Sequence, residues 1–173
     1  ALPISEKMAR RAVELGKDDA LALSTAGVAL AYVVGDLDDG AAVIEQAVAL
    51  NPNLAWAWLF SGFMNVWLGN PEVAIEHEAR AMRLSPQDLQ FWNMQVATAG
   101  AHLIAGRLAE ALSWVEAAAR SHPNYVLCEG IAAASAAHAG QLEIAHMAVE
   151  RCRYSRRLLR CNVVLRVLQV SPP

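Results

Sequence analysis

The chain has 173 residues, of which 55% are hydrophobic and 18% are charged, and its net charge at pH 7 is −3. This composition excludes an intrinsically disordered protein, which needs low hydrophobicity and high net charge, and three cysteines exclude a disulfide-dense scaffold. All 17 acidic residues and eight basic ones lie in residues 1–150, whereas residues 151–173 hold six arginines and no acid. The acidic body disfavours a nucleic-acid groove, which needs Lys and Arg along its working face.

The first predicted helix covers about residues 5–16. Its segment Ala12–Leu15 resembles Ala47–Leu50, which ends a later predicted helix. We therefore interpret residues 5–16 as the second helix of an incomplete helical hairpin. Because the first residue is Ala rather than Met, we expect the chain to be processed or to be a piece of a longer protein.

Four helical hairpins are predicted next, at about residues 21–54, 55–88, 92–125 and 126–157. A glycine divides each hairpin, small residues follow five and twelve positions later, and a proline closes three of the four. A period of about 34 residues is typical of helical-hairpin solenoids. The markers are Gly35, Gly40, Ala47 and Pro52, then Gly69, Ala74, Ala81 and Pro86, then Gly106, Ala111, Ala118 and Pro123, then Gly140, Ala145 and Cys152.

The residues around these markers predict how each hairpin turns. Glycine ends a helix in a left-handed conformation without strain, and small residues seven apart let two helices approach closely. Asp36 and Asn70 are predicted N-caps, and Pro71 fits the first turn of a helix. The acidic turn at residues 36–39 lacks the spacing of a calcium loop, so we interpret its charges as favourable to the dipole of the following helix.

The pattern resembles the tetratricopeptide repeat (TPR) family, most clearly in residues 55–86. The resemblance implies an all-α, right-handed solenoid of about nine helices over residues 1–155, built from a half-repeat and four repeats. The basic tail at residues 156–173 either packs as a cap or stays irregular. The residues on the family's signature positions in the second repeat are Trp58, Gly62, Gly69, Ala74, Ala81 and Pro86.

Residues 35–62 and 67–86 also resemble the TPR regions that follow nucleotide-cyclase or winged-helix regulator domains in some bacteria. This resemblance implies a module of a larger bacterial regulatory protein. No cyclase or winged-helix residue is present, so neither activity is implied for any position. An odd number of cysteines without a Cys-x-x-Cys pair favours a reducing compartment, and we expect a cytoplasmic location without a membrane span.

In the TPR family the first helix of each repeat lines the concave surface, and the resemblance implies that the positions facing it here are almost wholly apolar. In the first repeat they include Ala22, Thr25, Ala26, Ala29 and Val33. The Lys/Arg/Asn clamp of TPR chaperone adaptors is absent, so no binding of acidic chaperone tails is expected. The predicted partner-binding residues are Tyr32, Trp56, Leu59, Phe60, Phe63, Trp67, Asn93 and Leu103.

The predicted helix at residues 55–68 is apolar on all sides and carries an aromatic stripe. A helix of this kind is buried all round or presents an apolar groove. In the first interpretation neighbouring hairpins cover both faces. In the second the groove receives an amphipathic helix, an extended peptide, another domain or a second copy.

The polar residues do not predict an enzyme or a cofactor. No nucleophile elbow, phosphate loop or dinucleotide motif is present. His77 lies between two glutamates and is predicted to be solvated. His138 and His146 could approach Cys128 or Cys152, but a zinc site needs about four ligands, so we expect no metal.

The sequence therefore predicts a module that binds a protein or peptide partner in an apolar concave groove. The first alternative is a self-association scaffold that dimerises an attached output domain. The second is nucleic-acid contact through the arginine-rich tail, which the apolar concave face does not favour.

Overall fold

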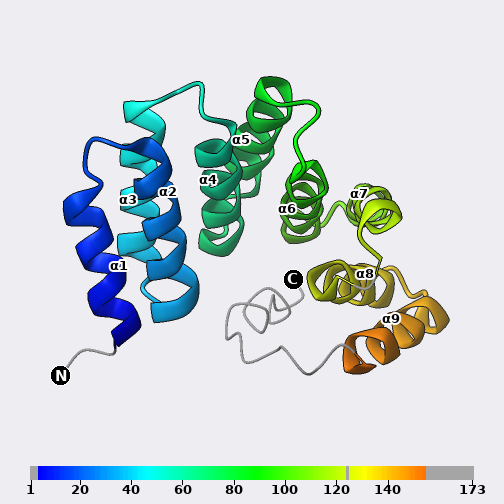
Figure 1. Cartoon of the computed structure of the whole chain (residues 1–173). Helices are drawn as coiled ribbons and strands as arrows, with labels where there is room; N and C mark the ends of the chain where they lie inside the picture. Colours follow the sequence, from blue (N-terminus) through cyan, green and yellow to red (C-terminus); the bar gives the residue numbers. More distant parts are fainter. Residues whose placement is uncertain (1–3, 124, 155–173) are drawn as a thin grey trace.

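Nine α-helices follow one another as hairpins in the residues that the computed structural model describes, which are 4–123 and 125–154 (Figure 1). A π-helical turn, η1 (Leu30–Val34), extends α2. The predicted tail at residues 156–173 lies outside the described residues. The helices are α1 (Ile4–Leu15), α2 (Ala20–Ala29), α3 (Leu37–Leu50), α4 (Ala55–Leu68), α5 (Pro71–Leu84), α6 (Phe91–Ile104), α7 (Leu108–Ser121), α8 (Val126–His138) and α9 (Leu142–Tyr154).

The helices form two layers. We call α2, α4, α6 and α8 the first helices of their hairpins, and each of them contacts the next one in the series. The second helices, α3, α5, α7 and α9, pack on the first helix of their own hairpin, and α1 packs on α2. Figure 1 shows the hairpins turning progressively from α1 to α9, as expected of a helical-hairpin solenoid.

The predicted glycine turns are confirmed. Gly35, Gly69, Gly106 and Gly140 all have positive φ, between 74° and 86°, and each follows the first helix of a hairpin. A residue with a Cβ is strained in this conformation, so glycine sets the point where each hairpin reverses.

Small residues bring the two helices of each hairpin close together, as predicted. In the first hairpin, a Cβ at Gly40 of α3 would lie 2.7 Å from the Ala31 Cβ of η1 and 2.7 Å from the Gly27 carbonyl oxygen of α2. In the later hairpins alanine is sufficient, and Ala74, Ala81, Ala111 and Ala118 have no exposed surface.

The helix starts differ from one another. The Asp36 carboxylate accepts a hydrogen bond from the Asp39 N–H at 3.3 Å and so caps α3 as predicted. Asn70 stands at the N-cap of α5, but its side chain makes no capping hydrogen bond and instead donates to the Asn65 Oδ1 at 3.4 Å. Pro71 begins α5 as predicted, since the first turn needs no N–H there.

Arg10 fastens α1 to the acidic turn before α3. Its guanidinium donates to Glu6 at 3.0 Å, to Asp36 at 3.0 Å and to Asp39 at 2.8 Å. The Arg10 guanidinium therefore lowers the pKa of the Asp39 carboxyl. The turn thus positions α1 as well as favouring the dipole of α3.

Among the described helices, none combines the length and the hydrophobicity that crossing a bilayer would require.

Candidate protein-binding surface

Four aromatic side chains lie partly exposed, three along α4 and one on η1 at the end of α2. We call Tyr32, Trp56, Phe60 and Trp67 the aromatic row. Trp56 and Phe60 meet edge to face with ring centroids 4.9 Å apart, and Tyr32 lies 5.3 Å from Trp67. Each of the four is half-buried, so the row combines fixed packing with accessible ring surface.

The structure divides the eight predicted groove residues into two sets. Tyr32, Trp56, Phe60, Trp67 and Asn93 are half-buried and keep accessible surface. The other three are core residues with 0% to 7% of their surface exposed, because the first helices pack directly against one another and cover these positions. The core set is Leu59, Phe63 and Leu103.

Neighbouring helices bury much of the apolar helix at residues 55–68, as the first interpretation expects, whereas the groove of the second interpretation stays a prediction. Ser61, Gly62 and Met64 belong to the buried faces of α4, which neighbouring helices cover. The aromatic row leaves one edge of α4 accessible. The Trp56 indole N–H is buried there without a hydrogen-bond partner among the described residues, as is the Asn93 Oδ1, which holds the equivalent position on α6.

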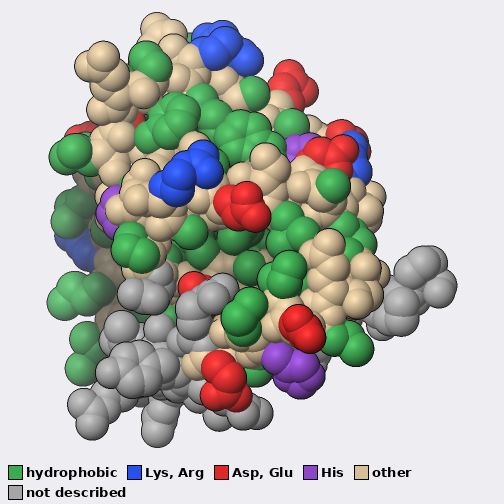
Figure 2. Space-filling model, turned by 90° about the vertical axis from the view of Figure 1, so that its right-hand side faces the viewer, with side chains coloured by type: hydrophobic (Ala, Val, Ile, Leu, Met, Phe, Trp, Pro, Cys, Tyr) green, Lys and Arg blue, Asp and Glu red, His purple; other side chains and the backbone are tan. Residues whose placement is uncertain are grey.

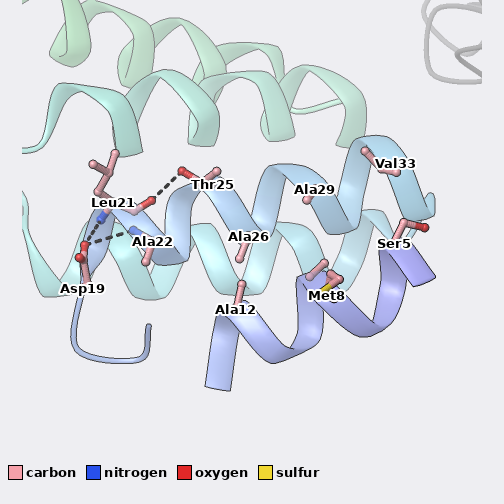
Figure 3. A pocket seen from close by; sticks show the side chains of 11 residues that line it. Ser5, Met8, Ala12, Asp19, Leu21, Ala22, Thr25, Ala26, Ala29 and Val33 are labelled. Carbon is pink, nitrogen blue, oxygen red and sulfur yellow. Dashed lines mark hydrogen bonds between the residues drawn. The ribbon is translucent and has the colours of Figure 1, made fainter. Parts of the chain in front are cut away.

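A second apolar surface lies between α1 and α2, and we call it the α1–α2 groove (Figure 3). It is open along its length and has a volume of about 620 Å³. Five of the predicted concave positions of the first repeat line it on the α2 side, which are Ala22, Thr25, Ala26, Ala29 and Val33. On the other side it is lined by Ser5, Met8, Ala9 and Ala12 of α1.

Exposed apolar side chains lie on both helices that form this groove, some in its lining and some beside it. Ile4, Met8 and Leu15 on α1 expose 79%, 68% and 71% of their surface, and they lie on one face of the helix. Leu21 and Val33 are also exposed on the α2 side. Contiguous exposed apolar surface of this kind usually marks an interaction site.

The exposed apolar residues at the other end of the molecule are arranged differently. Leu142, Ile144 and Met147 on α9 are exposed, but Glu143 and Glu150 are exposed on the same helix. Figure 2 shows the C-terminal side of the molecule, where charged and histidine side chains interrupt the hydrophobic ones. Of the described residues that line the α1–α2 groove, by contrast, Asp19 alone is charged.

A partly buried polar chain links α3, α4 and α5. The Ser61 hydroxyl donates to the Glu45 Oε1 at 2.7 Å and lies 2.8 Å from the His77 Nδ1. The Ser61 hydroxyl has one proton, and it donates this proton to Glu45. The hydrogen bond to His77 therefore needs a proton on the His77 Nδ1, and we assign the tautomer whose Nδ1–H donates to the Ser61 oxygen. The prediction that His77 is solvated is wrong, since the ring is half-buried, packs on Trp58, and has its pKa lowered by that burial.

Glu78 is a buried acid that the sequence prediction missed. Its side chain is fully buried, and neither carboxyl oxygen has a hydrogen-bond partner among the described residues. Burial raises its pKa well above the usual value. The repeat offers the signal that was overlooked, because Ile44 and Val115 hold the same position in neighbouring hairpins, nine residues after the turn glycine.

The remaining candidate ligands are dispersed over the described residues, where no group of three or more His, Cys, Asp or Glu side chains could hold a metal ion. His138 and His146 are exposed, and Cys128 is buried, which raises the pKa of its thiol to about 12. His102 accepts a hydrogen bond from the Arg107 Nε at 3.0 Å.

The sequence matches no protein-family model and no curated protein. Its structure is similar to that of PilW, described as a widely conserved type IV pilus biogenesis factor, with a TM-score of 0.73 at 15% sequence identity. That match covers 84% of this chain and 66% of PilW, so this chain spans just under two thirds of it.

Solved structures of MamA are also similar. A fragment of MamA from Desulfovibrio magneticus RS-1 matches with a TM-score of 0.65 at 16% identity, covering 91% of this chain and 99% of that one. Another MamA crystal structure matches with a TM-score of 0.64 at 13% identity, covering 89% and 95%. At such identities the likeness shows the fold, and it confirms the predicted all-α solenoid of consecutive hairpins.

Proposed function

We propose that this protein is a binding scaffold that holds an apolar segment of a partner protein on the surface formed by its first helices. The observation that carries this proposal is the aromatic row, which stays partly exposed. Aromatic side chains fixed by packing are the usual anchors of protein interfaces, because they bury a large area at little cost in conformational entropy.

The chemistry of the surface supports a partner that binds mainly through apolar burial. Neither α2 with η1 nor α4 carries a charged side chain. Burial of apolar area contributes about 25 cal/mol per Å², from which the ordering of both partners must be subtracted.

The test is a peptide library selected on the folded chain, followed by calorimetric titration of the selected peptide. We expect the Phe60→Ala/Trp67→Ala double variant to bind the peptide at least about tenfold more weakly while its far-UV circular dichroism stays helical. Leu89→Ala is the matched control, because Leu89 is 91% exposed and lies outside this surface. Unchanged affinity in the double variant would overturn the proposal, and unfolding would place the two residues in the core.

Self-association is the second candidate function, and the exposed apolar stripe of α1 favours it. Two copies that cover this stripe would form a dimer able to bring attached output domains together. Light scattering on a sizing column at several concentrations tests this. A dimer that the substitution Met8→Glu dissociates would support it, and a monomer at every concentration would contradict it.

The wider setting remains a prediction from the sequence. A cytoplasmic bacterial regulator, with a nucleotide-cyclase or winged-helix domain attached, rests on the resemblance of residues 35–62 and 67–86. The likeness to PilW and MamA adds no support for that setting.

A further inference from the structure

We infer that the α1–α2 groove receives an amphipathic α-helix of a partner protein, which lies beside α2, points large apolar side chains into the groove and carries acidic side chains along its edge next to α1. This inference rests on the proposed function and specifies one part of it. Four features of the groove lead to it: its place in the repeat, its size, its charge and its exposed rim.

The groove lies beside α1 at the place where a hairpin has its first helix. Ser5, Met8 and Ala12 on α1 correspond to Gly40, Val43 and Ala47 on α3, 35 residues later. On α3 these positions are buried where α3 packs on α2. On α1 the same positions are open and form one wall of the groove. A helix in the groove would therefore pack on α1 as α2 packs on α3, and on α2 as α2 packs on α4.

The size of the groove selects large side chains. Its α2 wall presents Ala22, Ala26 and Ala29 (Figure 3). The equivalent positions on α4 hold Trp56, Phe60 and Phe63, and α4 packs directly against α2. Because close packing requires large groups opposite small ones, Leu, Phe or Trp at successive turns of the incoming helix would fill the groove.

The charges around the groove differ between its two sides. Residues 20–34 hold no charged side chain. The carboxylate of Asp19 lines one end of the groove, but it caps α2 by accepting the Leu21 and Ala22 N–H groups at 2.8 and 3.1 Å. On α1, Lys7 lies three residues beyond Ile4 of the exposed stripe, and Arg11 lies three residues beyond Met8, which lines the groove, so both basic residues flank the stripe.

This basic edge favours an acidic partner over a second copy of the chain. Arg11 pairs with Glu14 at 2.7 Å, whereas Lys7 has no ion pair with any described residue. Two α1 helices laid against each other would bring the basic edges of both copies into the same interface. An acidic edge on the incoming helix complements Lys7 and Arg11 instead.

The experiment compares three labelled peptides of about 15 residues, the length of α2 with η1. All carry the same large apolar residues. The first has a helical apolar stripe with Glu along one edge, the second has Lys in place of Glu, and the third has the first composition scrambled to remove the stripe. We expect the acidic peptide to bind with helix formation, the basic one to bind at least about tenfold more weakly at low salt, and the scrambled one not to bind.

Amide chemical shifts locate the peptide, and variants test the assignment. The largest changes are expected at Met8, Ala12, Thr25 and Ala29. Met8→Glu should abolish binding, and Lys7→Glu with Arg11→Glu should reverse the preference between the acidic and basic peptides. Met147→Glu is the control, because Met147 is 56% exposed on α9, away from the groove. This variant should bind the acidic peptide as the unmodified chain does.

Three results would overturn the inference. Shift changes confined to the aromatic row would leave the proposed function standing and remove the groove from it. Equal affinity for the acidic and basic peptides would show that Lys7 and Arg11 do not select the charge of the partner helix. A dimer whose formation the acidic peptide blocks would make a second copy the occupant of the groove.

Discussion

The first two hairpins hold different side chains at the same repeat positions. On α2 these are Ala22, Ala26 and Ala29, whereas α4 has Trp and Phe there, 34 residues later. The large side chains of α4 pack toward α2, where Phe63 belongs to the core and Trp56 and Phe60 belong to the aromatic row. The small ones of α2 face the space beside α1 and leave a groove. The repeat position therefore determines which way a side chain faces, and its size and its neighbours determine whether that face is core or binding surface.

The largest expected difference between the two regions concerns Leu59 and its equivalent, Thr25. Leu59 has no exposed surface, so Leu59→Ala should lower the free energy of unfolding by about 3 kcal/mol. Thr25 is exposed on the open side of α2, and Thr25→Ala should change the free energy of unfolding by less than about 0.5 kcal/mol. Urea denaturation followed by far-UV circular dichroism measures both. Similar losses in the two variants would show that the α1–α2 groove is closed in solution.

A second comparison enlarges a side chain at equivalent positions of α3 and α1. Gly40→Leu should cost about 2–3 kcal/mol, because its Cβ alone would meet the Ala31 Cβ at 2.7 Å. Ser5 holds that position on α1 but is exposed on the open groove, so Ser5→Leu should stay within about 0.5 kcal/mol. A large loss in the Ser5 variant would mean that a helix of the protein already fills the groove.

Glu78 gives a third comparison, since Ile44 stands at its position in the first full hairpin. The pKa of Glu78 is higher in the folded protein than in the unfolded chain, so its protonated form stabilises the fold below the unfolded pKa of about 4.3. That stability falls as the pH rises toward the folded pKa. No side chain on α4 is ionisable, and the only one on α6 is His102, which bonds Arg107, so neither helix offers Glu78 a counter-charge.

Glu78→Ile should therefore raise the free energy of unfolding by about 1–3 kcal/mol at pH 8 and by less at pH 5. Urea titrations at several pH values check this, and Glu116→Gln on the exposed face of α7 is the control for loss of an acidic charge. The difference in the free energy of unfolding between Glu78→Ile and the unmodified chain should grow with pH. A difference that stays constant with pH would contradict the raised pKa of Glu78.

The fold could be predicted because its determinants are local and repeated. Each turn glycine ends a first helix in a left-handed conformation, and the small residues five and twelve positions later identify the face on which the hairpin closes. These requirements depend on backbone geometry and close approach, so four copies of them in one register specify the hairpins without knowledge of the neighbours.

The binding surface could be predicted only in part, because accessibility depends on packing between hairpins. Leu59 and Phe63 occupy predicted concave positions, yet direct contact between first helices buries them. The α1 wall of the groove was not predicted, since the sequence of α1 does not show which of its faces stays open. The prediction for His77 fails because two flanking glutamates favour a solvated position, although the repeat places Ile or Val at the position of Glu78.

The smallest expected effect concerns the anchor that holds the groove in shape. Arg10 joins Glu6, Asp36 and Asp39, and these contacts fix α1 beside the start of α3. Arg10→Ala should leave the later hairpins unchanged and raise the amide hydrogen-exchange rates of α1 alone, because only α1 loses its attachment. The matched control is Arg11→Ala, whose partner Glu14 lies on the same helix.

The same anchor should weaken in acid. Asp39 has a lowered pKa, so its contribution is present above the unfolded pKa of about 3.9 and is lost as the pH falls through the folded value. Once Asp39 is protonated, the exchange rates of α1, corrected for the intrinsic pH dependence, should approach those of Arg10→Ala. If exchange in α1 is equally protected in the variant, apolar packing of Ala9 and Val13 holds the helix, and the groove keeps its shape without the ion pairs.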